Sequence, residues 1–126
     1  MKHPTPDELL AGILARDPRY TMEAYAFVRA GLDFTVRRLE KPRHVSGQEL
    51  LAGIRESAIE EFGPMAKTVL NGWGINRTED VGEIVFNMVE SGLLGKTKED
   101  SRADFANGYD FDEAFRKPFK PAVSRS

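Results

Sequence analysis

Five basic side chains lie close together between positions 37 and 44, where they could bind an anion or an acidic partner. They are Arg37, Arg38, Lys41, Arg43 and His44. Between Arg29 and His44 the formal charge is +3, because five Arg and Lys side chains oppose one Asp and one Glu. The alternative is that these side chains only make the end of a helix polar and solvent-exposed. Cations are favoured there because they interact with the C-terminal end of the helix dipole.

His44 is also the histidine inside the predicted folded body, since His3 precedes the first predicted helix. A general base needs a partner group and a substrate proton within hydrogen-bonding reach. No spacing in the sequence supplies that partner, and a loop histidine hydrogen-bonded to the backbone is the alternative. We therefore predict no catalytic residue. An enzyme would have to gather His44, Trp73 and carboxylates in one pocket.

The sequence predicts neither a metal site nor a bound cofactor. It contains no cysteine, which excludes disulfides, thiolate catalysis and cysteine-ligated zinc or iron–sulfur centres. The acidic residues at 110–113 lack the alternating ligand positions and the central glycine of a calcium-binding EF-hand. The glycines around Trp73 lack the lysine and the preceding strand of a phosphate-binding loop. Trp73 itself is predicted either as a plug in the core or as an aromatic side chain at a pocket or surface.

Length and composition indicate one soluble domain. The 126 residues carry a net charge of −2, so no overall field attracts the protein to nucleic acid. No apolar run reaches the roughly 18 residues of a transmembrane helix, and the first residues lack the apolar core of a secretory signal. We therefore expect a cytoplasmic protein without membrane contact. Residues 1–115 are predicted to form a single helical domain and residues 116–126 a flexible basic tail.

Helix start and stop signals predict an all-α fold, a compact bundle of five to six helices. The predicted helices span residues 6–16, 21–40, 46–62, 64–71 and 79–91. Capping boxes begin the first and third of them, at Thr5 and Ser46. Thr78 is predicted to cap the last, and Gly92 to end it in a left-handed conformation. Gly31, in the middle of the longest helix, predicts a close contact between helices, with a tolerated defect as the alternative.

The segment after Gly95 fits two structures. A capping box at 97–100 predicts a short helix, whereas a short hairpin there would make the fold winged-helix-like. Asn107-Gly108 predicts a turn. Three aromatic side chains are predicted to dock the remaining segment on the bundle: Tyr109, Phe111 and Phe115.

A winged-helix arrangement would place the helix at 79–91 in the position of a DNA-recognition helix. This helix contains Glu79, Asp80, Glu83 and Glu90 and neither Lys nor Arg. Because phosphates repel carboxylates, we do not expect DNA to be read through it.

Five short stretches of the chain together resemble a known family. The stretches are RHVSGQELL (43–51), GPMA (63–66), WGI (73–75), GEIVFN (82–87) and YDF (109–111). They are similar to a family of conserved hypothetical proteins associated with planctomycete and verrucomicrobial bacteria, and the resemblance spans about residues 25–115. It implies a small, stand-alone bacterial protein. The family has no assigned activity, cofactor or catalytic residue, so the resemblance transfers no functional position.

These observations predict a small non-enzymatic protein-interaction or adaptor module with a protein partner. The prediction rests on the lack of a nucleophile–base pair, of metal-ligand spacing and of a phosphate-binding loop. The alternative is a nucleic-acid-associated regulator that uses the basic surface Arg37–His44.

Overall fold

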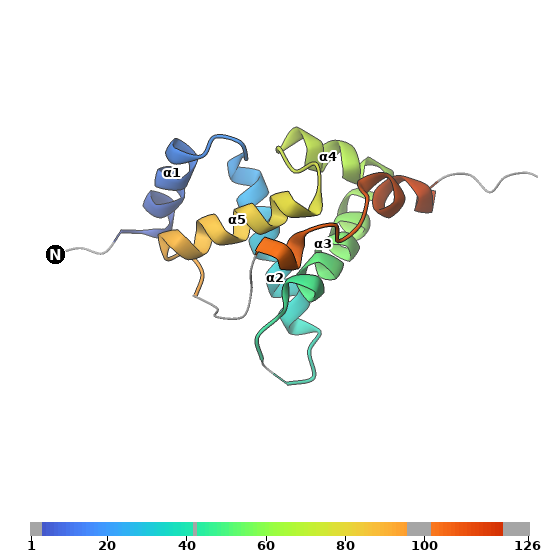
Figure 1. Cartoon of the computed structure of the whole chain (residues 1–126), viewed down its shortest axis with the longest axis horizontal. Coiled ribbons are helices and arrows are strands. Elements are labelled where there is room, and N and C mark those ends of the chain that lie inside the picture. Colours follow the sequence, from blue (N-terminus) through green and yellow to red (C-terminus); the bar gives the residue numbers. More distant parts are fainter. Residues whose placement is uncertain (1–3, 42, 96–101, 120–126) are drawn as a thin grey trace, which may run out of the picture.

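Every regular element in the described part of the chain is helical, so the fold is all-α as predicted. The computed structural model describes residues 4–41, 43–95 and 102–119. Its α-helices are α1 (Pro6–Arg16), α2 (Met22–Arg37), α3 (Gly47–Phe62), α4 (Ala66–Gly72) and α5 (Thr78–Ser91). Short helical turns join or follow them: η1 (Gly63–Met65), η2 (Arg102–Phe105), η3 (Asp112–Arg116) and η4 (Lys117–Phe119). α1 lies at one end of the bundle, and η3 and η4 lie at the other (Figure 1).

Two helices begin with the capping boxes that the sequence predicts. At α1, the Glu8 amide donates to the Thr5 hydroxyl over 3.1 Å, and the Thr5 amide donates to the Glu8 carboxylate over 2.8 Å. Ser46 and Glu49 make the same reciprocal pair at the start of α3, at 3.1 and 3.0 Å. These bonds satisfy amides that have no partner within the helix, which is why both starts fall where the sequence places them.

α2 ends at Arg37, three residues before its predicted end near Glu40. The amides of Arg38 and Leu39 donate to carbonyls only three residues back, over 3.2 and 3.1 Å. Such short-range bonds tighten the last turn and close the helix early.

The prediction that Thr78 caps α5 is wrong. Arg77 is the capping residue, and Thr78 is the first helical residue. The Asp80 carboxylate accepts hydrogen bonds from the amides of Asn76 and Arg77, so the helix start is satisfied without a threonine cap. The end of α5 is as predicted, because Gly92 takes a left-handed conformation with φ of 87°.

α2 and α3 pack at close range through small residues, which confirms the contact predicted from Gly31. A Cβ atom at Gly31 would overlap the side chain of Ile54. One turn further along, a Cβ atom at Gly53 would overlap the hydroxyl of Thr35. The Thr35 hydroxyl donates to the Gly31 carbonyl over 2.8 Å, so this buried polar group is satisfied within α2.

The C-terminal segment packs on the bundle through the aromatic side chains that the sequence predicts. Phe111 and Phe115 are buried, and Tyr109 packs beside them while its hydroxyl donates to the Leu51 carbonyl over 2.8 Å. Asn107 has a positive φ of 52° within the predicted turn. Helical turns continue through Phe119, and the rest of the predicted tail, 120–126, lies outside the described residues.

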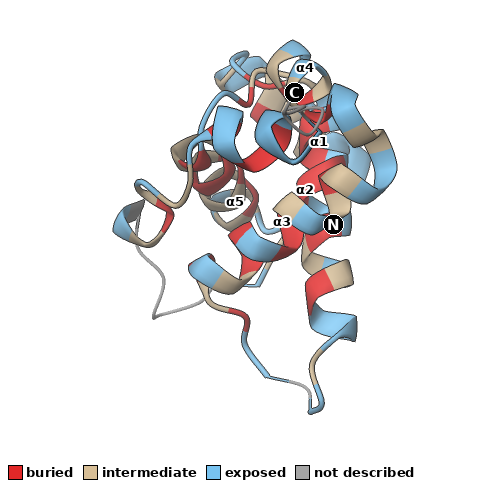
Figure 2. Ribbon diagram, turned by 90° about the vertical axis from the view of Figure 1, so that its right-hand side faces the viewer, coloured by how far each residue is buried: buried red, intermediate tan, exposed pale blue. Residues whose placement is uncertain are grey.

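The hairpin considered after Gly95 would begin in residues 96–101, which are outside the described residues. From Arg102 to Phe105 the chain forms η2 instead of a strand. Buried residues line the inner faces of the helices, and exposed residues follow their outer faces (Figure 2). Among the described helices, none combines the length and apolar character that crossing a membrane requires.

Candidate functional site

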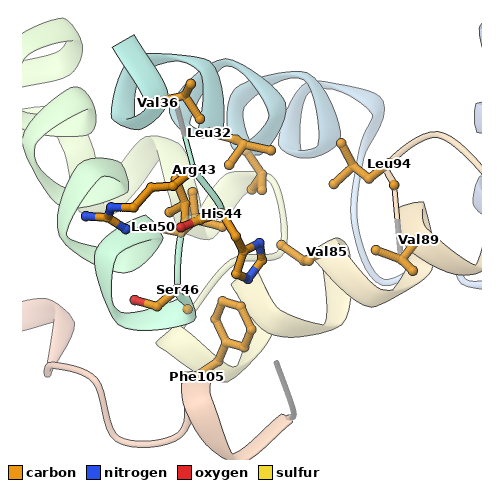
Figure 3. Close-up of a pocket in the computed structure, with 14 residues that line it drawn as sticks. Leu32, Val36, Arg43, His44, Ser46, Leu50, Val85, Val89, Leu94 and Phe105 are labelled. Carbon is orange, nitrogen blue, oxygen red and sulfur yellow. Dashed lines mark hydrogen bonds between the residues drawn. The ribbon is translucent and has the colours of Figure 1, made fainter. Parts of the chain in front are cut away.

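An apolar pocket of about 210 Å³ opens between α2, the start of α3, the second half of α5 and η2 (Figure 3). Its walls are mainly aliphatic: Leu32, Val36, Leu50, Val85, Val89 and Leu94. The ring of Phe105 lies beside them. Val36 is 39% exposed, which is high for a large apolar side chain, so it marks where the pocket meets solvent.

Helical periodicity explains why these side chains share a pocket. Val28, Leu32 and Val36 recur every four residues on α2, and Val85 and Val89 do so on α5, so each set lies on one face of its helix. The left-handed residue after α5 turns the chain back, and the Leu94 amide donates to the Met88 carbonyl over 3.2 Å. This turn places Leu94 against the same pocket.

Two glycines make the space for Phe105. A Cβ atom at Gly47 would lie 3.2 Å from the Phe105 ring, and one at Gly82 would lie 2.8 Å from it. A side chain at position 82 would therefore overlap the ring, and one at position 47 would require the ring to shift slightly. Neither glycine lies in a turn, so the sequence contains no local signal for this role.

Two of the five predicted basic residues, Arg43 and His44, line the pocket. Figure 3 shows the His44 imidazole between Val85 and Phe105, while the Arg43 side chain extends away from it. Neither Trp73 nor a carboxylate is among the described residues that line this pocket. Trp73, which an enzymatic site at His44 was expected to include, therefore lies outside this pocket.

Arg43 and Arg38 are each paired with a carboxylate of α3. The Arg43 guanidinium contacts both oxygens of Glu49, at 2.8 and 2.7 Å, and also donates to the His44 carbonyl. This double hydrogen bond from Arg43, with the Ser46 amide, lowers the pKa of Glu49 to about 2. Arg38 pairs with Glu56 at 2.7 Å. Their charges are thus largely compensated within the protein.

Arg37 and Lys41, the other two side chains of the predicted basic surface, are exposed at and after the end of α2. Neither forms an ion pair with a described side chain. Arg37 and Lys41 are therefore the exposed Arg and Lys side chains of the predicted basic surface that have no ion pair with a described residue, and neither lines the pocket.

Trp73 lies in a different part of the molecule. It is half-buried and packs against Phe27 and Phe62, with 5.6 Å between ring centroids in each pair. Phe62 ends α3 whereas His44 precedes it, and the length of α3 separates these ends by about 22 Å at 1.5 Å per residue. Trp73 thus packs the junction of α2, α3 and α4.

A second polar cluster joins the end of α1 to α2 and α5. The Arg19 guanidinium donates to both oxygens of Asp17, at 2.8 and 2.7 Å. The Asn87 amide donates to Asp17 and to the Tyr25 hydroxyl, each over 3.0 Å. The hydrogen bonds from Arg19 and Asn87 hold the pKa of Asp17 well below its usual range. The bonds from Asn87 on α5 thus reach both Asp17, at the end of α1, and Tyr25 on α2.

No grouping of three or more His, Asp or Glu side chains suited to a metal ion occurs within residues 4–41, 43–95 and 102–119. No family model matches the chain, and neither a curated protein nor a solved structure matches it. Membership of the bacterial family that the sequence resembles therefore stays a prediction.

Proposed function

We propose that this protein is a non-enzymatic protein-interaction module whose apolar pocket accepts one bulky apolar side chain of a partner. The observation that carries the proposal is the pocket itself, with aliphatic walls and a volume of about 210 Å³. An engineered cavity of about 150 Å³ holds benzene, so this pocket has room for a side chain the size of Leu or Phe. It is smaller than the roughly 300–1,000 Å³ of pockets that enclose cofactors and drug-sized ligands.

The position of the pocket on rigid helices supports this proposal. Its walls come from α2, α3 and α5, and the close packing of Gly31 against Ile54 fixes α2 on α3. A pocket formed before binding avoids the entropic cost of ordering loops around a partner. An apolar side chain that enters it is removed from water, which favours binding by about 25 cal/mol for each Å² buried.

Nucleic-acid association, the alternative function, has less support. Two of its five proposed contact residues, Arg38 and Arg43, already pair with Glu56 and Glu49. Binding to a polyanion would have to break these pairs or rely on Arg37 and Lys41 alone. This alternative would be favoured if the protein bound duplex or single-stranded nucleic acid and the binding weakened steeply with salt. The double variant Arg37→Ala/Lys41→Ala should then lose that binding.

A random peptide library displayed on phage tests the proposal without a known partner. Selection on the wild-type protein should enrich peptides that share a bulky apolar residue. The Val36→Gln/Val89→Gln variant makes the mouth and one wall polar, and should bind the selected peptides at least about tenfold more weakly, a loss of about 1.4 kcal/mol. Both positions are partly exposed, so the fold should persist, which circular dichroism checks.

Met65→Gln is the matched control, because Met65 is an exposed apolar residue (56%) on η1, at the other end of α3. It should bind the selected peptides as the wild type does. The proposal is wrong if no peptide is enriched, or if the enriched peptides bind the pocket variant as tightly as the wild type.

A further inference from the structure

We propose that the partner segment is acidic as well as apolar. Its bulky side chain enters the pocket, and neighbouring carboxylates contact Arg37 and Lys41. This inference rests on the proposed function, and it adds the chemical class of the partner.

The proposed occupant of the pocket belongs to another molecule. Gly95 and Phe105 both line the pocket, and the chain between Gly95 and Arg102 reads Lys-Thr-Lys-Glu-Asp-Ser. These six residues include no apolar side chain, so they offer nothing that could fill an aliphatic pocket. The protein's own neighbouring segment is thereby excluded as the source of the apolar group.

The charges beside the pocket favour a carboxylate-bearing partner. Arg37 directly follows Val36 at the exposed edge of the pocket, and Lys41 lies four residues further on. Both side chains are exposed and without an ion-pair partner among the described residues, whereas Arg38 and Arg43 are paired. Glu40 is the one acidic residue between Arg37 and Lys41, so the two cations outnumber the acid.

Exposed cations next to an apolar pocket contribute little to the binding free energy. Their main effect is to discriminate between partners of opposite charge. An exposed ion pair contributes about 0.2–1 kcal/mol, and a like-charged partner meets repulsion instead. Two such pairs correspond to an affinity change of about twofold to thirtyfold, with about three- to tenfold in the middle of that range. The apolar side chain would provide most of the binding free energy, and the carboxylates would set which segments are accepted.

Three labelled peptides of equal length separate these contributions. The first has a central phenylalanine flanked by glutamates, the second the same phenylalanine flanked by lysines, and the third glutamates around a central serine. Fluorescence polarisation at low salt should show tightest binding for the first peptide. Raising the salt to about 0.5 M should weaken it severalfold, because salt screens exposed charges.

Substitutions at the two cations provide the second arm of the test. Arg37→Ser/Lys41→Ser should weaken binding of the glutamate–phenylalanine peptide about three- to tenfold and strengthen binding of the lysine–phenylalanine peptide. Arg116→Ser/Lys117→Ser makes the same change in net charge on η3 and η4, and should leave both affinities unchanged. The residues it removes form only exposed pairs with Asp112 and Glu113, so it should fold normally.

The outcomes distinguish this inference from the proposed function. If the lysine–phenylalanine peptide binds as tightly as the glutamate one, Arg37 and Lys41 only solvate the helix end and the acidic-partner inference is overturned. That result would leave the apolar pocket as the docking site. If the serine peptide binds as well as the phenylalanine peptide, or none of the three binds, both proposals fall.

Discussion

The Thr78 hydroxyl donates a 2.6 Å hydrogen bond to the carbonyl oxygen of Phe105, 27 residues further along the chain. The same hydroxyl accepts a hydrogen bond of 3.0 Å from the Gly108 amide. Thr78 is 1% exposed, and its bond to Phe105 is buried while the bond from Gly108 is partly buried. They fasten the C-terminal segment to the first turn of α5 and hold the aromatic side of the pocket in place.

Thr78→Val should destabilise the protein by about 2–3 kcal/mol. Valine keeps the shape of threonine but leaves the Phe105 carbonyl and the Gly108 amide without their buried partner, which costs about 1–3 kcal/mol for each group. Thr78→Ser keeps the hydroxyl and should cost about 1 kcal/mol. Urea unfolding gives both values. Equal losses for the two variants would show that the hydroxyl is unimportant.

Gly82→Ala should lower the free energy of unfolding by about 2 kcal/mol, although alanine favours helices more than glycine does. The added methyl group would lie 2.8 Å from the Phe105 ring and would force it out of place.

Gly12→Ala is the matched control. Its methyl group would meet only the Arg16 guanidinium at 3.8 Å, so it should stabilise α1 by up to about 1 kcal/mol. Thermal unfolding followed by circular dichroism compares the two. A stabilised Gly82→Ala protein would contradict the packing described for Phe105.

Protonation of Asp17 in acid should lower the stability of the protein. Its pKa is lowered in the folded state, chiefly by the hydrogen bonds from Arg19, so its stabilising contribution is fully present above the unfolded pKa of about 3.9. That contribution is lost as the pH falls through this value toward the lower folded pKa. Arg19 is 56% exposed, and solvent screening therefore limits the effect to about 1 kcal/mol.

Asp17→Asn should thus be less stable than the wild type at pH 7, and the difference should shrink between about pH 5 and pH 2. Unfolding midpoints in urea across this range measure it. A constant difference at every pH would show that the Asp17 charge has no part in stability.

Substitutions at Trp73 should lower the stability of the protein without changing its affinity for peptides. Trp73→Ala should cost about 2 kcal/mol of stability, because it removes a half-buried ring from the cluster with Phe27 and Phe62. Trp73→Phe keeps an aromatic ring and should cost about half as much. Neither variant should change the affinity of the peptides selected on the wild type. A large loss of peptide affinity in stable Trp73→Phe would place the binding surface at this end of α3 instead.

The sequence predicted the helices well where the signal is local. Thr5 and Ser46 each bond a residue three positions away, so the capping boxes are visible in the sequence itself. Thr78 shows the limit of such signals. Its sequence context indicates a cap, but its hydroxyl bonds Phe105 at long range, while a carboxylate three residues into the helix satisfies the start of α5.

The candidate site was predicted only in part for a similar reason. Arg43 and His44 do line a pocket. Counting basic residues in the sequence, however, does not show which of them form ion pairs in the folded protein. Glu56 lies on a different helix from Arg38, and only folding brings the two side chains to 2.7 Å. The apolar walls of the pocket come from α2 and α5, which are far apart in sequence, so no local pattern predicts the cavity.

The close contact between α2 and α3 also limits how this sequence can diverge in evolution. A side chain at position 31 or 53 would overlap Ile54 or Thr35 unless that neighbouring side chain moved. Homologues with this fold should keep small residues at both positions, 22 residues apart, even where overall identity has been lost. They should also pair an aromatic residue equivalent to Phe105 with glycines equivalent to Gly47 and Gly82. Distant relatives of this chain can be recognised by that spaced pattern of small and aromatic residues.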